Sequence, residues 1–509
     1  MKNITIKKIA TFTLITMMIL CTGCAKIDQF GDTNANPNGI TSPVTAALLT
    51  NVISGLGGYA ANLGTGCYAQ YVSENQYTET SLYSLPQFDM SGAYSGSLQD
   101  LQTIIAYNSD PATSGIAAVN GSNANQIAIA RILKSFIFWQ TTDRWGDIPY
   151  SQALLGASNL TPKYDMQEDV YFGIIKECKQ AVASFDNGAP IKGDLLYGGN
   201  IANWKKFGNS LRMLMAMRLT KRYPAAGGKA AVEFDNAANA GHISTNSENA
   251  TLVYPGGSYK CPWFSVYETR DDYASSKTLG DVLSGLGDTR STVFGTNSVM
   301  FPYGLPRNLA IAYGNSVGSG QSRVLAVSKR LENSSIVIVS AAQVLLAKAE
   351  AKERGWIAGG SVSAEADYNA AITESYSQWG VALPAAYLSG AASYTAGAGV
   401  PGSIGAGAAP YDNFNVASNN IQDAATTTKL ARIALQRWIA NFPDGNQGWA
   451  EQRRTGVPNL KSSRFSTGAF VQRYVYATAD YSLNNANVIA AAARLTGGDK
   501  QDSKIWWNN

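Results

Sequence analysis

The stretch RILKSFIFWQTTDRWGDIPYSQAL, residues 131–154, gives the clearest indication of the fold. Apolar residues at and just before its start follow the spacing i, i+4, i+7 and i+8: Ile129, Leu133, Phe136 and Ile137. This spacing predicts a helix that buries one side. Gly146 and Pro149 then predict that the helix stops in a turn, because glycine favours a helix end and proline cannot continue a helix.

The polar residues around this turn are expected to hold the scaffold together. We predict that Asp143 and Asp147 cap neighbouring backbone amides and that Arg144 pairs with one of the two carboxylates. Two adjacent arginines further along the chain, Arg453 and Arg454, are interpreted as structural or partner-facing charges.

Helical spacing recurs outward from this stretch in both directions. Similar faces occur within residues 170–182, 204–218, 344–351, 430–438 and 488–495. These segments come in loose pairs, which favours tetratricopeptide-like stacking, although the sequence has no clean repeat of about 34 residues. Tryptophans at helical spacing are expected to pack in the core: Trp139, Trp204, Trp438 and Trp449.

Three stretches lack this spacing and are predicted to be irregular. Residues 59–94 are crowded with Tyr, Ser, Gly and Asn, and residues 254–313 carry aromatic side chains among Gly and Pro. Residues 380–420 form a Gly/Ala-rich loop excursion. Loops of this length in a folded protein are usually functional or mobile.

The N-terminus resembles a secretion signal with a lipid-attachment site. Basic residues precede an apolar run over residues 9–20, which is too short to span a bilayer, and two small residues then precede Cys24. We predict a signal peptide at residues 1–23, acylation of Cys24 and a polar tether over residues 24–44. An ordinary secretory signal is the alternative.

The charge and motif content excludes several classes of function. The chain has 40 Lys+Arg and 36 Asp+Glu, with three lysines in the first eight residues, so its body is near neutral and no nucleic-acid partner is expected. The only histidine, His242, excludes a multi-histidine zinc site. No nucleophile elbow, P-loop or dinucleotide fingerprint is present.

Three loop acids raise the question of glycoside hydrolysis: Glu268, Asp271 and Asp272. Acids in loops are more often solvated or bonded to backbone, so we predict that the protein is not an enzyme. No cofactor is predicted, although loop carboxylates and carbonyls are compatible with a structural calcium ion. Cys67, Cys178 and Cys261 lack CxxC spacing and are compatible with one disulfide plus a free thiol.

Five motifs occur in an order that resembles the SusD/RagB-like outer-membrane nutrient-binding lipoproteins. They are the opening stretch, NWKKFGNSLRMLMAMRLT at 203–220, AAQVLLAKAEAKERGW at 341–356, LQRWIANFPDGNQGWAEQRRTGVPNL at 435–460 and the ending GGDKQDSKIWWN. The chain departs from the family where Thr289 follows Asp288 in place of proline. It departs again after Arg473, where Ala477 and Asp480 stand for the family's Pro and Glu.

The resemblance implies a mainly α fold. Four tetratricopeptide-like helix pairs would form an α/α superhelix, packed against a less regular, loop-rich portion within one domain over residues 24–509. It also implies a lipid-anchored protein on the outer-membrane surface, forming a lid over a SusC-like TonB-dependent transporter. Capture of oligosaccharides for that transporter is the implied function, with peptide uptake as the alternative.

The irregular stretches are the expected source of ligand contacts. Sugars present apolar C–H faces and hydroxyls, so their binding sites combine Trp or Tyr with Asn, Asp, Arg or Gln. We predict eight ligand-binding residues on this basis: Asn75, Tyr77, Trp263, Tyr267, Arg270, Asp272, Tyr273 and Tyr303. An interface with the transporter and internal packing are the alternatives for the same residues.

Overall fold

The computed structural model describes residues 42–84, 88–318, 320–389, 426–460, 462–463, 465–466 and 468–509. The predicted signal peptide, Cys24, almost all of the predicted tether and residues 390–420 of the predicted loop excursion lie outside these ranges. Residues 44–509 form one compact unit.

Helix α8 (Asn123–Trp145) contains the first part, residues 131–145, of the stretch from which the fold was predicted. It begins where the Ser122 hydroxyl accepts the Asn125 amide at 3.4 Å. It ends at Gly146, whose φ of 89° is a conformation that glycine adopts without strain. The apolar face that runs from Ile129 to Ile137 is buried. The predicted helix and its end are confirmed.

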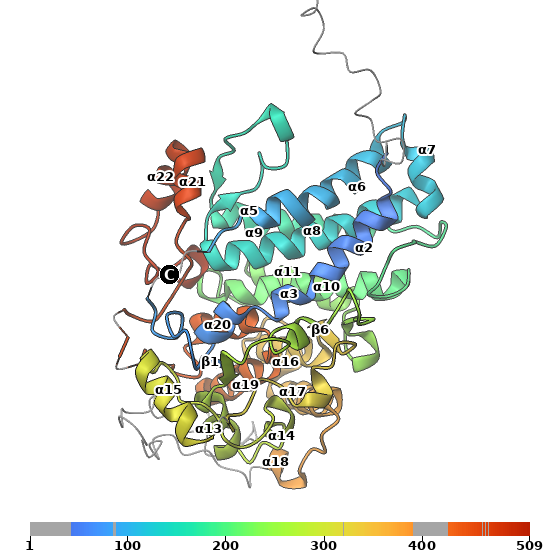
Figure 1. The fold of residues 1–509 in the computed structure, drawn as a ribbon. Helices are drawn as coiled ribbons and strands as arrows, with labels where there is room; N and C mark the ends of the chain where they lie inside the picture. Colours follow the sequence, from blue (N-terminus) through green and yellow to red (C-terminus); the bar gives the residue numbers. More distant parts are fainter. Residues whose placement is uncertain are drawn as a thin grey trace, which may run out of the picture. The chain divides into compact units, whose positions relative to one another are not determined.

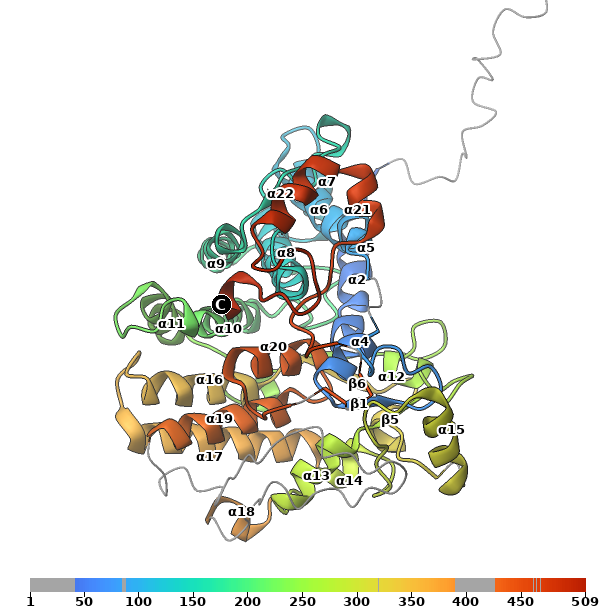
Figure 2. The same ribbon diagram turned by 90° about the vertical axis from the view of Figure 1, so that its left-hand side faces the viewer.

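Four pairs of consecutive helices form the scaffold of the described residues. The pairs are α8 with α9 (Gln167–Ala183), α10 (Ile201–Arg218) with α11 (Lys229–Asn239), α16 (Ala341–Glu353) with α17 (Gly360–Trp379), and α19 (Thr426–Asn441) with α20 (Gly445–Thr455). Successive pairs touch through α9 and α10, α10 and α16, and α16 and α19. Figures 1 and 2 show this stack of helices, and it confirms the predicted mainly α fold class.

Shorter elements cover the stack and build the loop-rich portion. The helices are α2 (Thr45–Gly55), α3 (Gly57–Ala60), α4 (Leu63–Tyr68), α5 (Ser91–Ala93), α6 (Gln99–Ser109), α7 (Ser114–Ala117), α12 (Pro262–Ser265), α13 (Lys277–Gly285), α14 (Ser291–Phe294), α15 (Arg307–Ser316), α18 (Ala385–Ser389), α21 (Thr478–Leu483) and α22 (Asn485–Ala493). The strands form three antiparallel pairs: β1 (Val72–Glu74) with β5 (Tyr273–Ser275), β2 (Ile148–Pro149) with β3 (Tyr164–Asp165), and β4 (Ala250–Val253) with β6 (Ser335–Val339).

The stretches 59–94 and 254–313 are therefore less irregular than predicted. The first contains α4 and β1, and the second contains α13 and most of α15. These elements were missed because they are too short for their hydrophobic spacing to separate a helix or strand from a loop.

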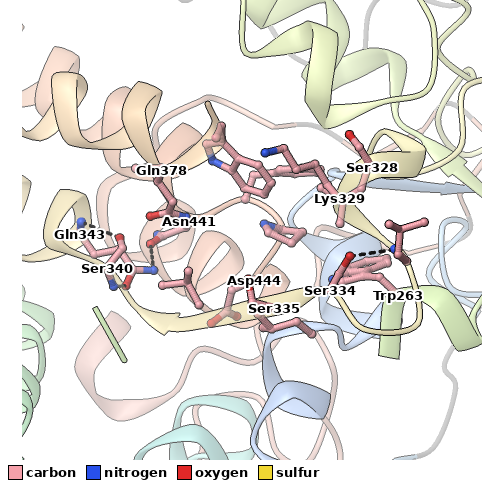
Figure 3. Close-up of a pocket in the computed structure, with 18 of the residues that line it drawn as sticks. Trp263, Ser328, Lys329, Ser334, Ser335, Ser340, Gln343, Gln378, Asn441 and Asp444 are labelled. Carbon is pink, nitrogen blue, oxygen red and sulfur yellow. Dashed lines mark hydrogen bonds between the residues drawn. The ribbon is translucent and has the colours of Figure 1, made fainter. Parts of the chain in front are cut away.

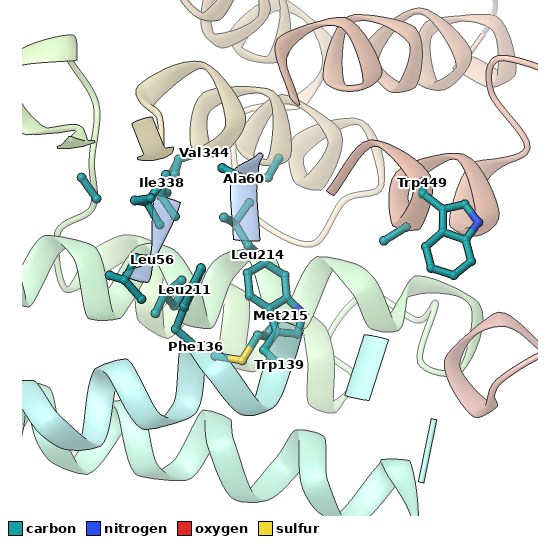
Figure 4. Close-up of a cluster of buried hydrophobic side chains, with 14 of the residues drawn as sticks. Leu56, Ala60, Phe136, Trp139, Leu211, Leu214, Met215, Ile338, Val344 and Trp449 are labelled. Carbon is teal, nitrogen blue, oxygen red and sulfur yellow. The ribbon is translucent and has the colours of Figure 1, made fainter. Parts of the chain in front are cut away.

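The core lies where the helix pairs meet one another and the first helices of the unit. Figure 4 shows side chains from α8, α10 and α16 packed together. The four tryptophans predicted for the core are all buried, and each indole N–H donates to a protein oxygen: to the Tyr171 hydroxyl, an Asp194 carboxylate, the Ala69 carbonyl and the Val471 carbonyl. The packing prediction is confirmed, and these indoles leave no donor free.

The prediction for the end of α8 is right for Asp147 and wrong for its neighbours. Asp147 accepts the Gln167 amide at 2.8 Å and so caps the start of α9. Asp143 instead accepts the Trp507 indole N–H at 2.9 Å, because it faces the core within α8, where helix amides are already bonded. Arg144 donates to the Gln140 carbonyl at 2.9 Å and pairs with neither aspartate in the described structure.

A buried ion cluster ties α16, α19 and α20 together. Arg454 makes a bidentate pair with Glu350, with N–O distances of 2.7 and 2.6 Å. Arg437 lies 3.1 Å from both Glu350 and Glu451. Burial would raise the pKa of Glu350, but the neighbouring guanidinium groups, Arg454 first among them, outweigh it and hold this pKa below its usual value. Arg454 is therefore structural.

Cys67, Cys178 and Cys261 are buried and free. They lie in α4, in α9 and directly before α12. The alternative of one disulfide among them is therefore wrong, since the fold keeps the three thiols in separate elements.

Candidate functional site

A short strand pair joins the two aromatic-rich stretches. Strand β1 pairs with β5 so that Val72 lies opposite Ser275 and Glu74 opposite Tyr273. The pairing continues where the Asn75 amide donates to the Asp272 carbonyl at 2.9 Å. Residues about 200 positions apart in the sequence are thereby held side by side, and they form one surface.

Tyr77 is the most exposed aromatic residue of this surface. Its side chain is 48% exposed. The Arg270 guanidinium carbon lies 4.9 Å from the ring centroid, and that of Arg307 lies 5.5 Å from it. Cations at these distances are attracted to the ring. We call Asn75, Tyr77, Arg270, Asp272 and Arg307 the Tyr77 surface.

The charged groups of the Tyr77 surface are held in place by further contacts. Arg270 pairs with Asp272 at 2.6 Å, and Arg307 donates to the Gln76 carbonyl at 3.1 Å. Asn75 is 93% buried, and its side-chain amide nitrogen has no hydrogen-bond partner within the described residues. The exposed part of the surface thus offers an aromatic ring, guanidinium donors and a carboxylate acceptor, which together suit a polar ligand with hydroxyl groups.

Tyr267, Tyr273 and Tyr303 are less exposed than Tyr77. The Tyr303 hydroxyl donates to the Cys67 carbonyl at 2.7 Å, and the Tyr267 hydroxyl accepts the Val324 amide at 2.9 Å. Tyr273 is half-buried in β5, and burial raises its pKa to about 12. Tyr267 and Tyr303 are buried with their hydroxyls bonded to backbone, so the structure does not bring these two side chains to the exposed surface.

Trp263 lies apart from the Tyr77 surface. It is buried in α12 and lines a cavity of about 360 Å³ that also touches the ends of α17 and α19 (Figure 3). The structure therefore separates the eight predicted ligand residues. Tyr77, Arg270 and Asp272 are at least partly exposed, Asn75 is buried beside them, the three other tyrosines are buried or half-buried, and Trp263 lies at a cavity.

Sequence reasoning missed Arg307, which completes the Tyr77 surface. This residue begins α15, and only the folded chain brings it to Tyr77. The sequence around Arg307 gives no indication of this contact, because the helix that Arg307 begins is too short to be recognised from its hydrophobic spacing.

The three loop acids do not form a catalytic pair. Asp271 pairs with Arg323 at 3.0 Å, Asp272 pairs with Arg270, and Glu268 pairs with Lys260. Glycoside hydrolysis needs one carboxyl group that stays protonated beside one that is ionised. Each of these acids instead has its own cation as its partner, so no two of them are arranged as an acid pair in the described structure.

The described residues also bear on three other kinds of function, which would need a metal-ligand cluster, a reactive histidine or a membrane-spanning helix. No group of three or more His, Cys, Asp or Glu among them is placed to hold a metal ion. His242 is half-buried, its Nδ1 lies 3.2 Å from the Ala238 carbonyl, and burial lowers its pKa. Within the same residues, no helix combines the length and the apolar character that crossing a membrane requires.

A family model described as starch-binding and associating with the outer membrane, of SusD-like type, matches residues 37–477. The chain belongs to this SusD-like family. The match spans most of the chain, including the four helix pairs and the Tyr77 surface. Membership places the protein among binding proteins that associate with an outer membrane. No curated protein sequence matches the chain.

Solved structures of SusD homologues share this fold. A SusD homologue from Bacteroides uniformis has a TM-score of 0.76 at 24% identity, over 92% of this chain and 99% of that one. A chitin-binding SusD homologue from Flavobacterium johnsoniae has a TM-score of 0.74 at 24% identity, over 91% and 98%. A homologue from Bacteroides thetaiotaomicron has a TM-score of 0.73 at 24% identity, over 90% and 98%. At these identities the likeness establishes the fold.

Proposed function

We propose that the protein captures oligosaccharides at the Tyr77 surface and delivers them to a SusC-like TonB-dependent transporter. The observation that carries this proposal is the exposed Tyr77 ring, near which the fold brings two guanidinium groups, of Arg270 and Arg307, from a distant part of the chain. The family description as starch-binding and the chitin-binding relative favour a glycan as the ligand.

The chemistry of the surface fits a neutral, hydroxyl-rich chain. A sugar hydroxyl can accept from the Arg270 or Arg307 guanidinium and donate to the Asp272 carboxylate. The tyrosine ring offers an apolar face for sugar C–H groups once a guanidinium moves aside. Arg270 is exposed and its pair with Asp272 lies at the protein surface, where solvent screens the attraction, so the guanidinium group can move aside at little cost.

Membrane attachment is proposed to occur through lipid on Cys24. A lipid anchor keeps the binding surface beside the membrane, where a barrel transporter opens. The protein itself is proposed to bind and not to convert the ligand, since the loop acids each pair with a cation.

A peptide is the second candidate ligand. Two guanidinium groups near one exposed ring favour a partner that carries a carboxylate, because arginine binds carboxylates in a bidentate manner. A peptide with a free C-terminus or acidic side chains supplies such a group, whereas starch and chitin chains supply only neutral oxygens.

The test is a binding screen of the purified full-length protein against arrayed oligosaccharides and a peptide pool, with product analysis of each hit. We expect an unchanged oligosaccharide to bind and Tyr77→Ala to weaken it about tenfold, since one aromatic contact contributes on the order of 1 to 2 kcal/mol. Tyr259→Ala is the matched control, because this tyrosine is 64% exposed outside the Tyr77 surface. Equal affinity in both variants, or cleavage of the ligand, would contradict the proposal.

A further inference from the structure

The loop that carries Tyr77 leaves strand β1 at Glu74 and returns to the core at Ser81. The Glu74 amide donates to the Ser81 hydroxyl at 3.3 Å, and the Ser81 amide donates to the Glu74 carboxylate at 2.8 Å. Glu74 is 4% exposed and Ser81 is fully buried, whereas Tyr77 between them is 48% exposed. These two reciprocal hydrogen bonds, which we call the Glu74–Ser81 bridge, close the loop over residues 75–80.

The bridge holds the loop on the side of Tyr77 that its other contacts leave free. On the N-terminal side, the Asn75 amide donates to the Asp272 carbonyl at 2.9 Å, and Arg307 donates to the Gln76 carbonyl at 3.1 Å. On the C-terminal side, the bridge ties the loop back to the end of β1. Without the bridge, Tyr77 would be held from one side, and its ring could move away from the guanidinium groups that lie near it.

The Glu74 carboxylate is buried without a cation beside it. In the described part of the chain it accepts from Ser81 and makes no ion pair with a lysine or arginine. Burial raises the pKa of this carboxyl group, and hydrogen bonds from Ser81 and Thr80 oppose the shift. The titratable groups that face it are acidic or uncharged at neutral pH: Cys67 and Tyr68 of α4, Tyr273 of β5, Tyr303, and the exposed Glu79 of the same loop. Hydrogen bonds alone therefore stabilise its charge.

We propose that Glu74 is a positioning residue of the Tyr77 surface: its carboxylate holds the loop in the binding conformation, and a proton on Glu74 loosens the loop. This inference rests on the proposed function of the surface and adds its control by pH. The ionised group accepts from the Ser81 amide more strongly than the protonated group, because a charged acceptor makes the stronger hydrogen bond. Ligand affinity should fall as Glu74 is protonated, since the observed affinity scales with the fraction of molecules whose loop is in place.

Hydrogen exchange of the full-length protein without ligand, followed by mass spectrometry of the peptide that covers the loop, tests the bridge. After correction for the intrinsic rate, protection of the wild-type loop should be about threefold or more lower at pH 4 than at pH 8. Glu74→Gln keeps an oxygen that accepts from the Ser81 amide but takes up no proton, so its protection should not change with pH.

Glu79→Gln is the matched control, because it removes an exposed carboxylate from the same loop and should keep the pH dependence of the wild type. A wild-type loop whose protection does not change with pH, or the same pH dependence in Glu74→Gln as in the wild type, would overturn the proposal.

Calorimetric titration with maltoheptaose and with a chitin hexasaccharide connects the loop to binding. Glu74→Leu removes the acceptor at similar size and should weaken binding at pH 8 about tenfold, whereas Glu74→Gln should bind nearly as the wild type does. Equal affinity of Glu74→Leu and the wild type would show that Glu74 does not position the surface. If neither sugar binds the wild type, the proposed function fails, and the exchange result still decides whether Glu74 holds the loop.

Discussion

The Asp444→Asn substitution should make the protein more stable, and more so at high pH. Asp444 begins α20, and its carboxylate accepts the Gln447 amide. Burial raises the pKa of this carboxyl group from 3.8 to about 7, although backbone hydrogen bonds and Arg144 oppose the shift. Asparagine caps a helix as well as aspartate does and carries no charge to bury.

The direction in which the free energy of unfolding changes with pH follows from proton binding by Asp444. The folded chain holds the Asp444 proton more tightly than the unfolded chain, so stability is highest below about pH 4 and falls as pH rises to about 7. With these two pKa values, the carboxyl group lowers the free energy of unfolding by about 1.7 kcal/mol at pH 5 and by about 4 kcal/mol at pH 8. The advantage of Asp444→Asn over the wild type should therefore grow by roughly 2 to 3 kcal/mol between these pH values.

Urea unfolding at pH 5 and pH 8, followed by circular dichroism, measures this difference. Other titrating groups cancel when variant and wild type are compared at the same pH. Asp186→Asn is the control, because hydrogen bonds from the Gly188 amide and the Ser122 hydroxyl lower the pKa of Asp186, which is then ionised at both pH values. A constant difference for Asp444→Asn across the pH range would refute the reasoning.

Three further predictions concern packing, charge and membrane attachment. Gly445→Ala should lower the free energy of unfolding, measured with urea, by about 3 kcal/mol, because the new Cβ would overlap the backbone of α4. The control Gly58→Ala adds a Cβ that meets no atom within 4 Å, so this variant should be neutral or slightly stabilising. Equal effects of the two substitutions would contradict this reasoning. Glu350→Ala leaves the buried Arg437 and Arg454 to share one carboxylate, Glu451, and should lower the same free energy by about 3 to 5 kcal/mol. A loss below about 1 kcal/mol would show that the cluster is not buried in solution. Cys24→Ala should release the protein from washed membranes while Cys21→Ala should not, and retention of the Cys24→Ala variant would remove the lipid anchor.

Local signals in the sequence predicted local structure well. The helix end at Gly146 depends on one residue's backbone conformation, so it could be predicted from the stretch itself. The role of Asp143 could not, because its partner Trp507 lies 364 residues away and reaches it only in the folded chain.

The same limit applies to the candidate site. The residue types of the Tyr77 surface were predicted from composition, but the contact between Tyr77 and Arg307 arises through the fold. In the sequence, Trp263 and Trp438 cannot be told apart, because each is a tryptophan next to apolar residues. They differ because the Trp438 indole donates to the Ala69 carbonyl, a contact that arises only in the folded chain, and the Trp263 indole donates to no group in the described structure.

The three buried thiols make the protein its own reporter of local opening. Burial raises the pKa of Cys67, Cys178 and Cys261, so a thiol reagent reaches each one only when its surroundings open. Since they lie in α4, α9 and before α12, their labelling rates would compare the helix pairs with the loop-rich portion in a single experiment. A ligand present during labelling would lower the labelling rate of each cysteine whose surroundings it stabilises. The pattern of slowed rates would locate the ligand without introducing a new residue into the chain.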